Sequence, residues 1–567
     1  MKTRTKLVSL LLVLVLIGGI FAGCKESSDK TSGPVIPKED DTANKGDNGD
    51  KTTGKGDKEE KKDEEGPLEA TLPIVEKPIR FTYWVPFGGI TKEVITDLGQ
   101  NEVYQEMEKL TNVQIEFIHP AEGQETEQFN LMIASGDLPD IIEQGERYKG
   151  GIDKAIADNI YIKLNDLVNQ YAPNFKKVID SDEELKKQVY SDNGNLLGFG
   201  MITTPAEGDS LEVGVETPWS GPFLRKDWLD ELGMEIPTTV EEWYAALKAF
   251  KEQKNAEVPM LWEKSGMQTS TGAFLSAFDI GPRFYVKEDE IKFGPTEPGF
   301  KEYLQLISRW YEESLIDRDF PSRDAKSSEA LYMGGKVGAL LQSGTAIMIK
   351  GDAVGIKWAG APYPQKDADT EIHWHQKNNI CRDNYGVITS KCENPEAAVK
   401  WFDYCYTLDG MRLFNFGVEG KSYTSIDEKG RPKYVDYISK NNYADFEKYL
   451  EVFRRHNGPY LKSAERSVPR MWMEDHLQYR IAWGNQPDDY VLPPVTMTET
   501  EGKEYATIMS DIDSYKDEMI LKFIIGDEPL DKFDEYVNKI KGMKIDRSIQ
   551  IYKDALDRYN KRTDKIK

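Results

Sequence analysis

The sequence predicts an α/β fold that is divided into two regions. The clearest signal is a strand–helix–strand–helix–strand order across residues 79–142, which is typical of a mostly parallel sheet. A second α/β region begins near residue 200, and two helices close the chain. The 567 residues are too many for one ordinary domain, and the 39% of apolar residues suffice for sizeable cores.

The first region is defined by alternating apolar residues. Apolar and polar residues alternate over 79–85 and again over 113–117, which predicts two strands. Helices are expected over about Asn101–Leu110 and Thr126–Ala134, and a short buried strand at Ile141–Ile142. In open sheets of this kind, ligands bind beyond the carboxyl ends of the strands. Residues that directly follow these strands are therefore candidates for a binding site.

The second region begins with a strand at Phe223–Leu224. A helix follows, for which we expect Asp227 as the N-terminal cap and Gly233 as the end. Thr239 and Glu242 have the spacing of a capping box, which predicts the start of the next helix. A later strand rich in small residues is expected at 337–342. Three later helices are expected at 394–406, 531–541 and 546–559.

The chain is strongly acidic, with a formal net charge of −25. Such a surface repels phosphate backbones and anionic headgroups, so the charge argues against nucleic-acid binding and against a polybasic membrane patch. Four Cys and five His leave little material for a zinc cluster or a dense disulfide scaffold.

The N-terminus has the features of an export signal. A basic start is followed by an uncharged apolar run from Leu7 to about Ile20, which is short for a membrane span. The run ends in Phe-Ala-Gly-Cys at 21–24, which resembles a bacterial lipobox, with Phe21 in place of the usual Leu. We expect residues 1–23 to be a lipoprotein signal peptide and Cys24 to carry the lipid. The alternative is an ordinary secretory signal with a chance cysteine.

Residues 24–67 are expected to be a disordered tether. They are nearly all charged or small polar residues and include no aromatic side chain. Such a segment cannot bury enough apolar surface to offset the entropy of ordering. A lipid, a polar tether and a globular body from residue 68 together form the layout of an extracellular lipoprotein.

Four short segments resemble a known family. They are Ala134–Ile142, Arg225–Leu229 with the Pro-Thr-Thr helix after it, Asn394–Phe402 and Phe414–Gly420. Each segment is weakly informative alone, but their order and spacing, together with the lipobox, resemble the extracellular solute-binding proteins of ABC importers, family 1, in the long lipoprotein form of Gram-positive bacteria.

The resemblance implies a two-lobed, periplasmic-binding-protein-like (type II) fold that closes over its ligand. It implies chain crossovers near residues 200, 341 and 416. The N-terminal lobe would then comprise residues 68–200 and 342–416, and the C-terminal lobe residues 201–341 and 417–567. Family ligands are mostly oligosaccharides, and alginate- and pectin-derived sugars are known among long members.

The resemblance also suggests what is missing. Long members often carry a calcium loop after the Pro-Thr-Thr helix, but Lys251–Pro259 is short and lacks the necessary run of Asp residues. Calcium takes six to eight oxygen ligands, so we expect no calcium site there. We expect no cofactor.

Nine residues are candidates for ligand contact. Aromatic platforms and polar groups in a cleft suit a sugar, and loops carry function more often than helices do. The candidates in loops, at strand ends or next to strands are Trp84, Glu143, Gln144, Trp219, Arg225, Trp262, Trp374, Tyr385 and Trp483. The alternatives are partial burial for the aromatic residues, a solvated turn for Glu143 and Gln144, and an ion pair of Arg225 with Asp227 or Asp230.

A histidine pair and a cysteine pair suggest a metal site and a disulfide. His373 and His375 would share one face of an extended segment, but no third metal ligand is evident unless Asp383 or Cys381 folds back, so we predict no metal site. Cys381 and Cys392 are close enough in sequence to form a disulfide, but sequence does not fix their distance.

The functional hypothesis is therefore a lipid-anchored receptor at the extracellular face of the cell membrane. It would act as a monomer, capture an oligosaccharide and deliver it to ABC permease subunits. The alternatives are a secreted carbohydrate-active enzyme and a peptide- or metal-binding receptor of the same fold. No hydrolase elbow, metalloprotease motif or phosphate loop occurs, which favours a binder over an enzyme.

Overall fold

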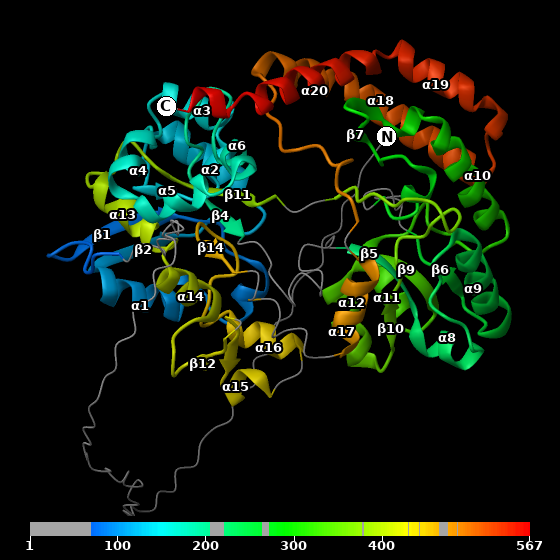
Figure 1. The fold of residues 1–567 in the computed structure, drawn as a ribbon, viewed down its shortest axis with the longest axis horizontal. Helices are drawn as coiled ribbons and strands as arrows, with labels where there is room; N and C mark the ends of the chain where they lie inside the picture. The colour runs from blue at the N-terminus through cyan, green and yellow to red at the C-terminus, as the bar shows by residue number, and fades with distance from the viewer. Residues whose placement is uncertain are drawn as a thin grey trace, which may run out of the picture. The chain divides into compact units, whose positions relative to one another are not determined.

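The computed structural model describes residues 70–203, 220–262, 272–376, 379–428, 430–440, 443–463, 466, 474–484 and 486–566. The predicted signal peptide, Cys24, the 24–67 tether and Trp219 lie outside the described residues. Two mixed α/β lobes, each built on its own sheet, make up most of the described chain (Figure 1). Among these residues, no helix has the length and apolar character needed to cross a membrane.

A six-stranded sheet organises the first lobe. Its strand order is β14 (Leu461–Lys462), β4 (Phe199–Thr203), β11 (Cys381–Ile388), β3 (Ile141–Ile142), β1 (Ile79–Trp84) and β2 (Val113–Ile118). Only β11 runs against the others, since it pairs antiparallel with both β3 and β4. The ends of β1, β3 and β4 therefore share one edge of the sheet with the beginning of β11. This arrangement confirms the predicted, mostly parallel sheet.

Ten helices and one small hairpin belong to the described part of the first lobe. They are α1 (Glu102–Thr111), α2 (Glu125–Ser135), α3 (Gly151–Ala157), α4 (Asn165–Tyr171), α5 (Pro173–Asp180), α6 (Glu183–Val189), α13 (Pro395–Tyr404), α14 (Leu408–Phe416), α15 (Asp436–Ser439) and α16 (Tyr443–Leu450), with β12 (Tyr423–Ile426) and β13 (Pro432–Tyr434).

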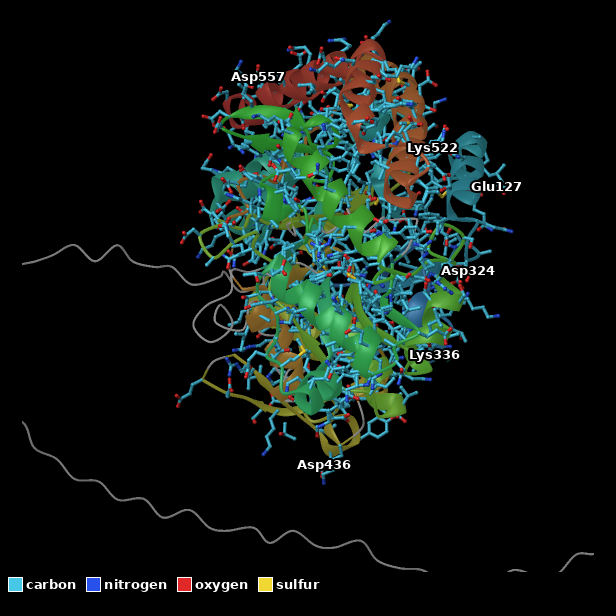
Figure 2. The ribbon with its side chains drawn as sticks, turned by 90° about the vertical axis from the view of Figure 1, so that its right-hand side faces the viewer. Glu127, Asp324, Lys336, Asp436, Lys522 and Asp557 are labelled. Carbon is cyan, nitrogen blue, oxygen red and sulfur yellow. The ribbon has the colours of Figure 1, made fainter. Side chains whose placement is uncertain are left out.

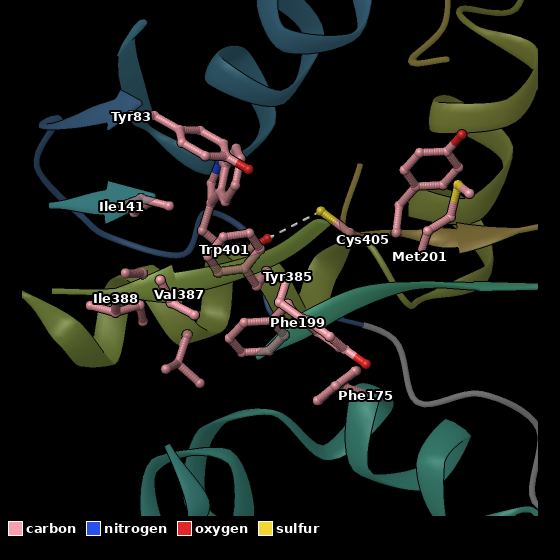
Figure 3. Close-up of a cluster of buried hydrophobic side chains, with 14 of the residues drawn as sticks. Tyr83, Ile141, Phe175, Phe199, Met201, Tyr385, Val387, Ile388, Trp401 and Cys405 are labelled. Atoms are coloured by element: carbon pink, nitrogen blue, oxygen red, sulfur yellow. Dashed lines mark hydrogen bonds between the residues drawn. The ribbon is translucent and has the colours of Figure 1, made fainter. Parts of the chain in front are cut away.

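Aromatic packing fixes α13 on this sheet. Tyr83 of β1 meets Trp401 edge-on at 6.2 Å between ring centroids, and Phe199 of β4 stacks on Phe402 at 4.4 Å. Figure 3 shows Tyr83, Phe199 and Trp401 in this cluster, with a hydrogen bond from the Cys405 thiol to the Trp401 carbonyl. Such aromatic pairs add to the stabilisation that burial of their area provides.

A four-stranded sheet organises the second lobe. Its order is β10 (Trp358–Gly360), β5 (Ser220–Arg225), β9 (Val337–Ser343) and β6 (Val258–Met260), and β5 is antiparallel to both neighbours. The other elements of this lobe are α8 (Lys226–Leu232), α9 (Val240–Gln253), β7 (Phe284–Lys287), β8 (Glu290–Phe293), α10 (Pro298–Glu312), α11 (Ala325–Met333), α12 (Gly344–Val354) and α17 (Glu474–Trp483).

Two helix starts were predicted in this lobe, with different outcomes. The capping box of α9 is confirmed, because the Thr239 hydroxyl accepts from the Glu242 amide and the Glu242 carboxylate accepts from the Thr239 amide. Gly233 ends α8 in the left-handed conformation, as predicted. Asp227 is not the cap of α8: the helix begins at Lys226 with Arg225 in the N-cap position, and Asp227 instead accepts from the Arg225 side chain.

Three helices end the chain: α18 (Glu499–Ile525), α19 (Phe533–Gly542) and α20 (Ile545–Asn560). The predicted helices at 531–541 and 546–559 correspond to α19 and α20. Beyond α20, the Arg562 guanidinium donates to Asp192 of the first lobe at 2.6 Å. Acidic side chains such as Glu127, Asp324, Asp436 and Asp557 project outward, as the negative net charge leads one to expect (Figure 2).

The chain passes between the lobes at points that differ from the prediction. Residues 342–374 were assigned to the first lobe, but β10 pairs with β5, and Trp374 is part of the second core. Residues 417–463 were assigned to the second lobe, but β14 pairs with β4 of the first sheet. The predicted crossovers at 341 and 416 are therefore corrected to the segments after 374 and after 463.

Candidate ligand-binding site

A pocket of about 320 Å³ lies beyond the ends of β1 and β3. It is lined by residues 86–91 after β1, by Glu143 and Gln144 after β3, by Asn384 of β11 and by residues 455–457. We call it the edge pocket. Its place is the one at which open α/β sheets bind ligands.

A buried ion pair forms one wall of the edge pocket. Glu143 and Arg455 are 3% and 7% exposed, and Arg455 Nη2 lies 3.0 and 3.1 Å from the two carboxylate oxygens. The Tyr83 hydroxyl donates to Glu143 at 2.8 Å. Burial and the adjacent Glu143 charge raise the pKa of Tyr83 well above its usual value, so the hydroxyl stays a donor.

A second buried carboxylate supports the same wall. Glu451 accepts from the Thr91 hydroxyl at 2.6 Å and lies 3.0 Å from His456 Nδ1. Burial opposes ionisation of Glu451, but the hydrogen bond from His456 and the charge of Arg454 hold its pKa well below the usual value. These contacts fix the orientation of His456, a residue that lines the pocket.

A larger cavity of about 810 Å³ lies further along the same edge. The first lobe lines this cavity with residues of 146–154 and 188–197 and with the start of β11. The rest of the lining comes from residues 494–499 and the end of α20. We call it the large cavity. Gln144 lines the edge pocket and Glu146 the large cavity, so the two spaces are neighbours along the sheet edge.

Glu146 binds the backbone of β11 between the edge pocket and the large cavity. Its carboxylate accepts from the backbone amides of Asn384 at 2.9 Å and Tyr385 at 3.1 Å. At this point β11 has an irregular register, and Asn384 has a φ of 77°. A left-handed residue is tolerated best when it is Gly or Asn. This bulge directs Asn384 to the edge pocket and Tyr385 to the large cavity.

Three of the predicted site residues lie at this edge. Glu143 and Gln144 line the edge pocket and Tyr385 lines the large cavity. The Tyr385 hydroxyl already donates to the Gln188 carbonyl at 3.0 Å, and Gln144 accepts from Arg147. Ligand contact by these three residues remains a prediction.

Four predicted tryptophans are packed within the cores. Trp84, Trp262, Trp374 and Trp483 are 3%, 0%, 6% and 1% exposed. Trp84 meets Phe129 at 5.5 Å between centroids, and Trp483 meets Phe223 at the same separation. These four rings are buried more completely than partial burial, the alternative given for each, and do not form open platforms. Ligand contact through these rings would require the surrounding chain to move.

Arg225 is held by its own helix start. It is 7% exposed, donates from Nε to Asp227 at 2.8 Å and from Nη1 to the Gly335 carbonyl at 3.0 Å. The guanidinium also lies 4.2 Å from the centroid of the Trp228 ring. The ion pair with Asp227, which was the alternative to ligand binding, describes this residue.

The two histidines of the 373–375 segment have different surroundings. His373 Nδ1 lies 2.7 Å from Asp489, and the ring stacks on Tyr490 at 3.9 Å. Neither ring nitrogen of His375 has a hydrogen-bond partner among the described residues. The described part of the chain contains no cluster of three or more His, Cys, Asp or Glu side chains that could hold a metal ion. In the same part of the chain, Cys381, Cys392 and Cys405 are not joined in disulfides.

His375 is expected to make the protein sensitive to acid. Burial lowers the pKa of His375 to about 3, whereas histidine in an unfolded chain has a pKa of about 6.5. The stabilisation from neutral His375 is thus fully present above about pH 6.5. It is lost as the pH falls towards 3, at roughly 1.4 kcal/mol per pH unit. As the pH is lowered from 7.5 to 4.5, the melting temperature of H375Q should fall less steeply than that of the wild type. Identical slopes of melting temperature against pH would contradict this role of His375.

Several residues at this edge could not be recognised from the sequence. Arg455, His456 and Asn457 follow α16 in the sequence, more than 300 positions from Glu143. The only local signal is an Arg-Arg-His run in an acidic chain. That run does not indicate which strand it faces. Glu146 and Asn384 were not predicted either. Their roles arise from the irregular pairing of β11, which the local sequence does not indicate.

The comparisons with known sequences agree with this geometry. The family model of bacterial extracellular solute-binding proteins matches residues 88–412. The fructooligosaccharide ABC transporter substrate-binding protein FusA of Streptococcus pneumoniae serotype 4 is 24% identical over 487 residues, which are 82% of this chain and 88% of FusA. The polygalacturonan/rhamnogalacturonan-binding protein YtcQ of Bacillus subtilis is 25% identical over 248 residues, 42% of this chain and 46% of YtcQ.

Solved structures show the same fold. The alginate-binding protein AlgQ2 without calcium ion has a TM-score of 0.64 at 23% identity, covering 86% of this chain and 100% of that chain. FusA of Streptococcus pneumoniae in complex with kestose has a TM-score of 0.65 at 22% identity, covering 85% and 99%. The two-lobed α/β fold class is thereby confirmed, as is the family resemblance. Since the family model covers more than half of the sequence, the chain belongs to the bacterial extracellular solute-binding proteins.

Proposed function

We propose that the protein is the receptor of an ABC importer and captures an oligosaccharide at the edge of its six-stranded sheet. The closed, liganded form would then deliver the sugar to the permease subunits in the membrane. Cys24 would carry the lipid that anchors the monomer to the extracellular face, with residues 24–67 as a tether.

The observation that carries this proposal is the likeness to FusA along 82% of the chain, together with the two cavities. Their volumes of about 320 and 810 Å³ are in the range of small-molecule sites. Amides, carboxylates and a phenol line them, and these groups suit the many hydroxyls of a sugar.

The protein is proposed to bind its sugar without altering it. The relatives named above are binding proteins, and a binder needs no catalytic pair of carboxylates set across a glycosidic bond. We therefore expect the oligosaccharide to be recovered unchanged after incubation.

A thermal-shift screen of the purified protein tests the proposal. The panel contains kestose, nystose, malto-oligosaccharides, galacturonan oligosaccharides and, as controls, peptides. A ligand at 100 times its dissociation constant should stabilise the protein by about 2.7 kcal/mol, which raises the melting temperature measurably. A saturable shift with one sugar class and no new reducing ends is the expected result. A shift with peptides alone, or release of sugar products, would overturn the proposal.

A variant of Gln144 should weaken binding of the sugar found in this screen. Gln144 lies in the left-handed region with φ of 65°, which asparagine tolerates well. Q144N therefore keeps the backbone but withdraws the amide from the edge pocket. We expect a roughly tenfold higher Kd by calorimetry, equivalent to about one hydrogen bond. The exposed Q105N is the control and should bind like the wild type. Equal Kd values for all three proteins would remove Gln144 from the site.

A further inference from the structure

We infer that the sugar bound at this edge is uncharged, which excludes uronate oligosaccharides as its main ligands. The inference rests on the proposed function and narrows it. It is carried by one observation: among the described residues, every cation that lines the edge pocket or the large cavity already has a partner within the protein.

In the edge pocket the two basic residues are Arg455 and His456. Arg455 contacts both oxygens of Glu143, and both side chains are more than nine-tenths buried. His456 is paired through Nδ1 with Glu451. A ligand carboxylate could bind Arg455 bidentately only by displacing Glu143, which would leave that buried carboxylate without its partner.

In the large cavity the basic residues are Lys154, Arg558, Arg562 and Lys565. Lys154 lies 2.6 Å from Asp158, one turn further along the chain. Arg558 and Arg562 both donate to Asp192, at 3.1 and 2.6 Å. Arg558 also donates to both oxygens of Glu501, and Lys565 donates to the Asp192 carbonyl at 2.7 Å. All four basic side chains are thus engaged within the protein, Lys565 with a backbone carbonyl and the other three with carboxylates.

The acidic residues of the large cavity complete the balance. Glu146, Asp153, Asp192 and Glu499 line it, which matches the four basic residues in number. Asp153 accepts from Ser191, Asn193 and Asn195 at 2.7 to 2.8 Å. The four acidic and four basic side chains of the large cavity thus balance in formal charge.

A neutral lining in an acidic protein disfavours an anionic ligand in two ways. A carboxylate that leaves water must be paired with a cation, and here each candidate cation is already engaged with a group of the protein. The net charge of −25 adds a longer-range repulsion that salt weakens. Hydroxyl groups meet neither obstacle, because they exchange hydrogen bonds with amides and carboxylates that remain paired.

Calorimetric titration with a matched ligand pair tests the inference. Galacturonan tetrasaccharide and its full methyl ester share a backbone but differ in charge, and kestose and nystose serve as neutral sugars of another shape. We expect the free acid to bind at least tenfold more weakly than its ester, or not at all when a neutral fructan binds. An acid that binds as tightly as its ester, or alone, would overturn the inference while the receptor function stands. Failure of every sugar would instead overturn the proposed function.

A variant pair tests whether ion pairing causes the discrimination. D158N releases Lys154, a cation that lines the large cavity, from an exposed i,i+4 pair. D180N releases Lys176 from an exposed pair of the same spacing on α5, outside both cavities. D158N should raise the affinity for the free acid severalfold and leave the ester unchanged, whereas D180N should change neither. Equal behaviour of the two variants would contradict the role assigned to Lys154.

Discussion

Replacement of Arg455 by alanine is expected to lower the free energy of unfolding by about 3–5 kcal/mol, the usual cost of breaking a buried ion pair. The guanidinium contacts both Glu143 oxygens, and Glu143 is 3% exposed. Without Arg455 the carboxylate would keep only the Tyr83 hydroxyl as a charge-stabilising partner among the described contacts. Thermal and urea unfolding of the variant measure the loss. Sugar binding should be lost with it, because the wall of the edge pocket would collapse or reorganise.

Two further variants separate charge from packing. R455M combined with E143Q removes both charges and keeps most of the volume, so it should recover most of the lost stability. R80A breaks an exposed pair with Glu116, in which both side chains are more than half exposed, and should cost less than about 1 kcal/mol. If R455A were no less stable than R80A, the buried pair would not support the site as described.

The second large effect is expected at Arg562. This side chain is 1% exposed and joins three segments, through Asp192 at 2.6 Å, the Lys187 carbonyl at 2.7 Å and the Thr496 hydroxyl at 2.8 Å. R562A should cost about 2–4 kcal/mol, somewhat less than R455A, because Asp192 keeps Arg558 as a partner. The melting temperature should fall by several degrees.

The same helical region offers a matched control for this prediction. Arg547 of α20 pairs with Glu504 of α18, but both side chains are 40% exposed. R547A should therefore change stability by less than about 1 kcal/mol. Equal melting temperatures for R562A and R547A would mean that the buried contact does not fasten the end of the chain to the first lobe.

Local sequence patterns predicted three of the six strands of the first sheet, β1, β2 and β3. The alternation over 79–85 and 113–117 corresponds to β1 and β2, and the capping-box spacing correctly marked the start of α9. These features depend on neighbours within a few residues, so a single sequence contains them. The 27-residue helix α18 was not predicted. Its buried positions are few and widely spaced, with charged residues between them.

The long-range features could not be predicted in the same way. Nothing in the sequence places Arg455 beside Glu143, 312 positions away. Loop position alone did not distinguish an exposed tryptophan from a packed one: Trp262 follows a short strand but is fully buried. The lobe boundaries were displaced because β9 continues through α12 into β10 within the same sheet, which a short strand pattern does not reveal.

The binding site is tested most directly by a crystal structure of the protein with the sugar that gives the largest thermal shift. An uncharged oligosaccharide is expected at the carboxyl edge of the six-stranded sheet. Its hydroxyls should lie within hydrogen-bonding distance of edge-pocket and large-cavity residues, Gln144 among them, with the Glu143–Arg455 pair intact. A sugar bound away from this edge, or one whose carboxylate has displaced Glu143 from Arg455, would contradict this expectation.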